Sequence, residues 1–213
     1  MTSLLFSAKS ALSLTLYDDR ASFLNDTSAA ETALEVKGSG VEIFTLDNLT
    51  FTIARPSPET LNLGGFDWTT RLPGIDLGIN GVESFNIDLG DPVNSFGFDF
   101  VEPEFDPFVN SPVFIDSTFE ITFLNSGSLI NSFQFTRPND IATFVGFSSE
   151  FIFDRVEIEE IVGAAENEFF GSFYTGVDSN SESVPEPSLI VGYGFFGLGV
   201  SLMKKSRVRQ FKK

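Results

Sequence analysis

Residues 95–100 read Ser-Phe-Gly-Phe-Asp-Phe, and this alternation of phenylalanine with small or polar residues decides the fold class. Successive side chains of a β-strand point to opposite faces of a sheet, so a period of two predicts one apolar face and one wet face. The same period recurs at residues 84–89 (SFNIDL), 118–123 (TFEITF) and 156–159 (VEIE). The sequence therefore predicts a mainly β protein, a jelly-roll-like antiparallel β-sandwich.

Two local signals add a helix and a hairpin to these strands. Asp18 and Asp19 precede the helix-forming run 20–24 (RASFL) and can cap its N-terminus, which predicts one short N-terminal helix. Residues 125–128 (NSGS) separate two alternating runs and predict a hairpin turn.

Phenylalanine is unusually frequent, with 26 residues against 1 Trp and 3 Tyr. At a period of two, these rings are expected to fill the core between two facing sheets, because each aromatic side chain buries a large area. A sugar-stacking platform would be expected to use Trp and Tyr instead. The composition therefore favours a core role over a lectin-like surface.

Composition also excludes several kinds of chemistry. The chain has 0 Cys and 0 His, which excludes disulfides, thiol nucleophiles and imidazole acid–base catalysis. The net charge is −17, and such an acidic chain repels phosphate backbones, so we expect no nucleic-acid partner. Solubility explains the acidity, and cation binding is the alternative.

The start of the chain only partly matches a leader peptide. It is moderately apolar, but no basic residue precedes the apolar stretch and Lys9 interrupts it. A first β-strand is the competing interpretation. We expect residues 1–12 to be the remnant of a signal peptide that starts upstream, and residues 13–177 to form the β-sandwich domain.

The end of the chain has three consecutive parts after a polar linker at residues 178–183 (DSNSES). Residues 184–188 contain two prolines and cannot form a regular helix. Residues 189–203 carry no charge and predict a transmembrane helix, although a helix of this length spans only about 22 Å of a ~30 Å hydrocarbon core. The basic tail at 204–213 can snorkel and predicts a cytoplasmic C-terminus.

These three parts resemble the PEP-CTERM sorting signal of exopolysaccharide-producing Gram-negative bacteria. The motif residues are Val184, Pro185, Glu186, Pro187 and Ser188, and the basic stop-transfer residues are Lys204, Lys205, Arg207, Arg209, Lys212 and Lys213. The resemblance implies recognition by exosortase, a membrane processing enzyme, and cleavage near the Pro-Glu-Pro triplet. The hydrophobic sorting helix would then be a transient inner-membrane anchor, followed by delivery to the cell surface or extracellular matrix.

The body of the chain is similar to a domain that often precedes this signal, mostly in cyanobacterial proteins. The matching stretches are 16–24 (LYDDRASFL), 71–74 (RLPG), 96–100 (FGFDF), 144–147 (FVGF) and 166–171 (ENEFFG). The resemblance brings no biochemical activity with it, and the N-terminus departs from the full signal peptide expected of the group.

Acidic residues supply the candidate ligand sites. Asp99, Glu102, Glu104 and Asp106 lie close together in the sequence, and Pro103 and Pro107 favour an extended loop, which could turn several carboxylates toward one Ca²⁺. Glu166, Asn167 and Glu168 could supply further oxygens. The chain has no recognised calcium-binding spacing, so solvated charge is the preferred interpretation, and no metal or cofactor site is assigned.

Trp68 and Arg71 could line a ligand groove, but a core position for the tryptophan and a surface ion pair for the arginine are the favoured interpretations. The sequence therefore predicts a non-enzymatic exported protein, with exosortase and transiently the inner membrane as partners. The alternative is a carbohydrate-binding module, with or without Ca²⁺, acting on exopolysaccharide. A glycoside hydrolase with a carboxylate pair is the third hypothesis.

Overall fold

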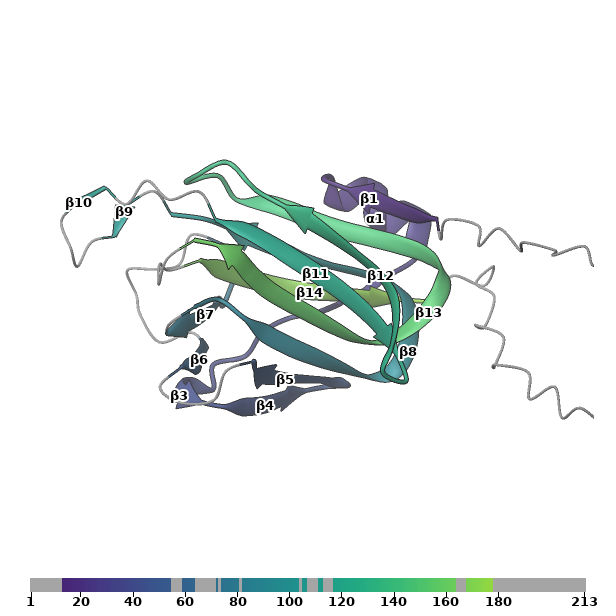
Figure 1. The fold of residues 1–213 in the computed structure, drawn as a ribbon, viewed down its shortest axis with the longest axis horizontal. Helices are drawn as coiled ribbons and strands as arrows, with labels where there is room; N and C mark the ends of the chain where they lie inside the picture. Colours follow the sequence, from purple (N-terminus) through teal and green to yellow (C-terminus); the bar gives the residue numbers. More distant parts are fainter. Residues whose placement is uncertain are drawn as a thin grey trace, which may run out of the picture.

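A computed structural model describes residues 13–54, 59–63, 72, 74–80, 82–103, 105–106, 111–112, 117–163 and 168–177 (Figure 1). The elements in chain order are β1 (Leu14–Tyr17), α1 (Arg20–Thr27), β2 (Ala30–Thr32), β3 (Gly38–Val41), β4 (Ile43–Leu46), β5 (Leu49–Ile53), β6 (Thr60–Leu63), β7 (Leu77–Asn80), β8 (Phe85–Val101), β9 (Phe105–Asp106), β10 (Ser111–Pro112), β11 (Thr118–Asn125), β12 (Ser128–Phe135), β13 (Thr143–Val162) and β14 (Phe169–Gly176). The predicted mainly β class is confirmed.

One large antiparallel sheet contains most of the strands. Its central path runs β12-β11-β13-β8-β14-β7-β6-β3, with β1 beside β13, β2 beside β14, and the β4–β5 hairpin beside β8. The strands β9 and β10 form a small separate ribbon. Every pairing between these strands is antiparallel.

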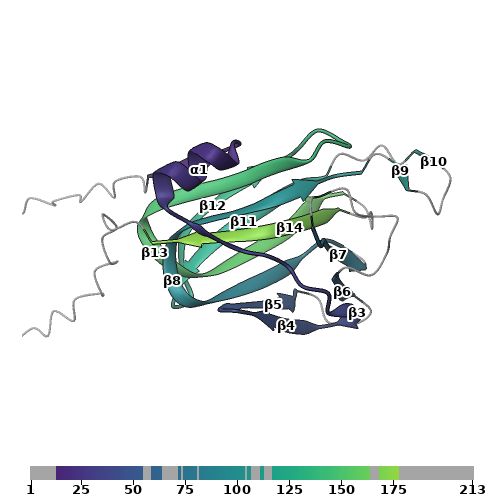
Figure 2. The same cartoon turned by 180° about the vertical axis from the view of Figure 1, so that it is seen from behind.

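The two longest strands, β8 and β13, bend and fold the sheet onto itself. The first half of β8 pairs with β5, where Phe85 lies opposite Ile53, and its second half pairs with β14, where Phe100 lies opposite Phe170. The β8–β13 register shifts between the halves, and Figures 1 and 2 show both strands curving at the same end of the molecule. Both ends of β8 therefore lie at the opposite end of the fold.

Phenylalanine rings fill the space between the two halves of the folded sheet. The ring centroids of Phe85 and Phe170 are 4.9 Å apart, and those of Phe100 and Phe119 are 5.4 Å apart. Among the described residues, the largest fully buried side chains are all phenylalanines. The predicted core role of these residues is confirmed, and the apolar face of each alternating run is the face that packs inward.

The second half of β8 departs from the expected wet outer face. Ser95 and Asp99 alternate with the core phenylalanines, yet they are 0% and 3% exposed. The helix α1 lies over the sheet on this side (Figure 2). Phe23 of α1 forms a small buried aromatic cluster with Phe144 and Tyr174 there. Gly97, which lies between Ser95 and Asp99 in the sequence, lets the Phe144 ring pack directly on the strand, because a Cβ at this position would lie only 2.7 Å from Phe144 Cζ.

Both local sequence signals are confirmed. Asp19 caps α1, and its carboxylate accepts a hydrogen bond from the Ser22 N–H at 2.7 Å. Ser126 and Gly127 join β11 to β12 and have φ of 49° and 76°, the positive values that a tight hairpin turn requires.

No helix within the described parts of the chain is long and apolar enough to span a membrane. Residues 1–12 and 178–213 lie outside the described residues. The leader remnant, the polar linker and the three-part tail therefore stay predictions.

Candidate functional site

A polar pocket opens where α1 meets the outer face of the sheet. Its volume is about 530 Å³. The lining residues are Asp18, Asp19, Arg20, Leu72, Asp99, Arg137, Pro138, Ala142, Thr143 and Phe144. They come from the first residue of α1 and the two residues before it, the second half of β8, the connection between β12 and β13, the start of β13, and Leu72. The helix, the sheet and a loop therefore build the pocket together.

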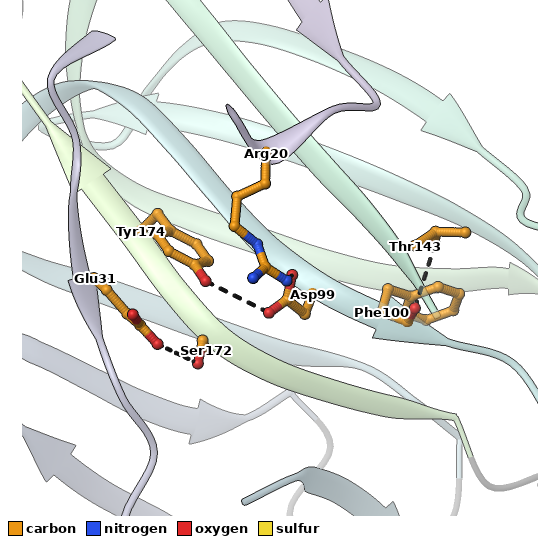
Figure 3. A network of polar contacts seen from close by, with 7 residues as sticks. All are labelled: Arg20, Glu31, Asp99, Phe100, Thr143, Ser172 and Tyr174. Carbon is orange, nitrogen blue, oxygen red and sulfur yellow. Dashed lines mark hydrogen bonds and ion pairs between the residues drawn. The ribbon is translucent and has the colours of Figure 1, made fainter. Parts of the chain in front are cut away.

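Asp99 is the buried centre of the pocket wall (Figure 3). Arg20 Nη2 donates to Asp99 Oδ1 at 2.5 Å, and the Tyr174 hydroxyl lies 3.5 Å from Asp99 Oδ2. The guanidinium of Arg20 also lies 5.6 Å from the centre of the Tyr174 ring. One cation therefore neutralises the carboxylate and packs on the adjacent aromatic ring.

The surroundings of Asp99 shift the pKa values of this group and of its neighbour. Burial raises the pKa of Asp99, and the ion pair with Arg20 opposes that rise. Burial and the negative charge of Asp99 raise the pKa of Tyr174 to about 12. The tyrosine is therefore protonated at neutral pH and can donate a hydrogen bond to Asp99.

Arg137 and Thr143 also line the pocket. Arg137 Nη2 lies 3.4 Å from the carbonyl oxygen of Phe144, and its guanidinium is 5.7 Å from the centre of the Phe135 ring. Burial lowers the pKa of Arg137, and the charge of Asp18 opposes this. The Thr143 hydroxyl donates to the carbonyl of Phe100 at 3.3 Å (Figure 3). The pocket thus presents donors and acceptors side by side.

A second polar site lies at the open end of the folded sheet, inside the core. Glu83 precedes β8, Glu160 lies near the end of β13, and Glu168 precedes β14; their carboxylates each place an oxygen within 4.8 Å of the other two. Glu83 and Glu168 are 0% exposed and Glu160 is 6% exposed. Because β8 and β13 bend, residues from both halves of the sheet meet here.

Ser117, which precedes β11, links the members of this carboxylate cluster. Its hydroxyl donates to Glu168 Oε1 at 2.6 Å and lies 3.4 Å from Glu160 Oε1. Its N–H donates to Glu102 Oε1 at 2.5 Å, which brings a fourth carboxylate to the same place. The Glu83 N–H donates to Glu160 Oε2 at 3.0 Å.

The cluster concentrates negative charge where water is excluded. Burial raises the pKa of Glu83 far above its ordinary value, and the charges of Glu168 and Glu160 raise it further. Burial also raises the pKa of Glu168 to about 7, although the Ser117 hydrogen bond lowers it. Such an arrangement holds either protons or a cation at neutral pH.

The structure separates the carboxylates that the sequence analysis grouped together. Glu102 and Glu168 join the buried cluster, whereas Asp99 points to the other face of β8 and pairs with Arg20. The remaining candidates, Glu104, Asp106, Glu166 and Asn167, lie outside the described side chains, as do Trp68 and Arg71.

Sequence reasoning missed Glu83, Glu160 and Ser117, although the alternation contains a signal for them. Glu83 and Ser117 each lie two residues before a core phenylalanine, and Glu160 lies two residues after the buried Ile158. Each polar residue thus continues an apolar strand face. A polar residue at a core-facing position is the pattern that predicts a buried site.

Comparison with known proteins adds no relative: no protein-family model matches the chain, and no curated protein matches it significantly.

Proposed function

We propose that this chain is a non-enzymatic exported protein of the cell surface or extracellular matrix, built as a jelly-roll-like β-sandwich with a PEP-CTERM sorting signal. The observation that carries the proposal is the order of motif, apolar segment and basic cluster over residues 184–213. An exosortase-like enzyme would cleave near Pro185–Pro187 after transient insertion of residues 189–203 in the inner membrane.

The fold supports this division between body and tail. β14, which precedes the tail in sequence, is paired with β8 along one edge and with β7 and β2 along the other. The tail is therefore not needed as a partner for that strand. The two halves of the sheet, facing each other across the phenylalanine core, support the sandwich assignment.

Intact mass spectrometry tests the sorting hypothesis. The protein is expressed in a host with its exosortase and in the same host without it, and the surface and membrane fractions are compared. We expect a mass that ends near residues 185–187 only when the enzyme is present. A full-length C-terminus at the surface in both hosts would contradict the proposal.

Two tail variants separate anchoring from recognition. Changing Pro185, Glu186 and Pro187 to alanine should leave membrane insertion intact and block cleavage, because the anchor is unchanged. Truncation after Met203 removes the basic residues, each worth about 1 kcal/mol near an anionic leaflet, and should weaken the anchor itself. If both variants were processed like the parent, the sorting hypothesis would be wrong.

Carbohydrate binding is the second candidate, and the polar pocket favours it. Asp18, Asp19, Arg137 and Thr143 surround a volume of about 530 Å³, a size typical of small-molecule sites. Their mixture of donors and acceptors suits sugar hydroxyls. Exopolysaccharide fragments should bind the wild type and bind Arg137→Met more weakly in calorimetry, with Arg155→Met, far from the pocket residues in the fold, as the control.

A glycan-binding result would be repeated with and without chelator, to separate calcium-dependent binding from direct binding. Release of reducing sugar would instead favour the hydrolase hypothesis. Absence of binding to every fragment would contradict the carbohydrate-binding alternative.

A further inference from the structure

The carboxylate cluster contains a buried side chain that lacks a hydrogen-bond partner. Both carboxyl oxygens of Glu83 are without one among the described residues, and so is Glu168 Oε2. Burying an ionised carboxylate without a partner is strongly unfavourable. An ionised Glu83 at this buried position would therefore need a positively charged partner.

Among the described residues, no basic side chain forms an ion pair with these three carboxylates. The ion pairs within the described regions involve Asp99, Glu35, Asp88 and Glu157, and none of them joins Glu83, Glu160 or Glu168 to a basic residue. The neighbouring Ser117 can neutralise no charge. The missing counterpart is therefore an ion from solution or a set of protons.

The cluster has dimensions that suit a single ion. The three glutamate oxygens lie within 4.8 Å of one another, and a Ca²⁺ ion binds oxygens at about 2.3–2.6 Å. An ion between them can therefore reach all three. The Ser117 hydroxyl contacts Glu168 and lies 3.4 Å from Glu160, so it offers a further oxygen to the same ion.

We propose that Glu83, Glu160 and Glu168, together with the Ser117 hydroxyl, form a closed structural binding site for one Ca²⁺ ion.

The ligand chemistry favours calcium over other divalent cations. Every offered ligand is oxygen and the chain has 0 His and 0 Cys, which removes the nitrogen and sulfur ligands preferred by zinc. Mg²⁺ dehydrates reluctantly and usually keeps several waters. Ligands that are 0–6% exposed leave little access for those waters. Calcium accepts an all-protein oxygen cage with bidentate carboxylates.

Burial also decides what the ion would do. A polymer substrate cannot reach carboxylates that are at most 6% exposed, so the site is structural. It would join the start of β8 and the end of β13 to the start of β14, and thereby hold the two halves of the folded sheet together at their open end. The calcium site would form whether or not the protein is exported, and it uses no residue of the segment 178–213.

Calorimetry and thermal unfolding of the chelator-treated full-length protein test the proposal, with CaCl₂ as the ligand and MgCl₂ as the comparison. We expect one bound Ca²⁺ per chain. When calcium is present at about 100 times its dissociation constant, the melting temperature should rise by about 5–10 °C. Working at about 0.15 M salt screens exposed charges beyond about 8 Å and suppresses diffuse binding to the acidic surface.

Isosteric variants locate the ion. Glu83→Gln and Glu168→Gln should each lower calcium affinity by at least about tenfold and reduce the thermal shift. Glu159→Gln is the matched control, because this neighbour of Glu160 lies on the same strand but faces solvent, and it should respond like the wild type.

Glu83→Gln also guards against misfolding as an explanation, since removing an unpartnered buried carboxyl should leave the calcium-free variant at least as stable as the wild type. No calcium-dependent shift in the wild type would overturn the proposal. The proposal would also be overturned if Glu83→Gln retained wild-type affinity for calcium, or if Mg²⁺ raised the melting temperature as much as Ca²⁺ does.

Discussion

Asp99 lies in β8 and Glu83 lies two residues before the same strand; both carboxylates are buried, but their surroundings differ. Asp99 faces α1 and receives a cation from the chain, through the 2.5 Å contact with Arg20. Glu83 faces the phenylalanine core and meets other carboxylates instead. Among the described residues, the carboxylate that faces α1 has a basic partner, and the carboxylate that faces the core has none.

The difference has a simple steric and electrostatic origin. The side chain of Arg20 is 43% exposed, so its guanidinium keeps part of its hydration while it reaches Asp99. A guanidinium in the closed core would lose that hydration and would displace aromatic rings. The compensation proposed for the core site is therefore a small ion or a proton.

The largest expected effect is a pH dependence of the calcium-free protein. The pKa of Glu168 rises from 4.5 to about 7 in the folded state, so the folded protein holds this proton more tightly than the unfolded chain. Its stabilising contribution is complete below about pH 4.5 and is lost as the pH rises through about 7, a change of about 3 kcal/mol. Glu83, whose pKa is also raised, acts in the same direction.

Urea unfolding of chelator-treated protein between about pH 5 and about pH 7 measures this dependence. Glu168→Gln should flatten the curve, and saturating calcium should flatten it in the wild type. Equal pH profiles for the wild type and Glu168→Gln would contradict the role assigned to this carboxylate.

At Asp99 the charge is already compensated by Arg20, so removing that partner is expected to destabilise the protein. Arg20→Met removes the cation and leaves Asp99 buried alone, and it should destabilise the protein by about 2–3 kcal/mol; a fully buried pair would lose more. Asp99→Asn in that background should restore part of the loss, because the unpaired charge disappears. Denaturant unfolding of the two single variants and the double variant measures the coupling.

Glu83→Gln should change the unfolding free energy by less than Arg20→Met does, and in the opposite direction, because it should stabilise the protein. In calcium-free protein at neutral pH, the glutamine no longer needs to bind a proton to become neutral, and its amide can donate to the neighbouring carboxylates. We expect a gain of about 1–2 kcal/mol in unfolding free energy. A loss of similar size would mean that the ionised form of Glu83 stabilises the fold.

The smallest effect is expected at an exposed ion pair. Arg155 contacts Asp88 at 2.9 Å and Glu157 at 2.8 Å on the outer face of the sheet, where all three side chains are at least 33% exposed. Arg155→Met should change the unfolding free energy by about 0.5 kcal/mol and less at high salt. A change as large as that of Arg20→Met would show that burial is not what separates the two kinds of site.

Local chemistry made a large part of the fold predictable. The period of two places Phe96, Phe98 and Phe100 on one strand face, the Asp19 carboxylate caps the following helix, and the turn at residues 126–127 closes a hairpin. These features depend on interactions between residues that are close in sequence. They are therefore visible without knowledge of the rest of the chain.

The candidate sites depend on contacts between residues that are far apart in the sequence. Residues 99–106 were grouped because they are neighbours, yet alternation along β8 sends Asp99 and Glu102 to opposite faces. The bend of β8 and β13 then brings Glu83, Glu160 and Glu168 together from distant positions. Residue types and their spacing by themselves determined the strands, the helix, the hairpin and the order of segments in the tail. Only the tertiary structure decided which carboxylates meet, because strand register and strand bending are set by the packing of the whole core.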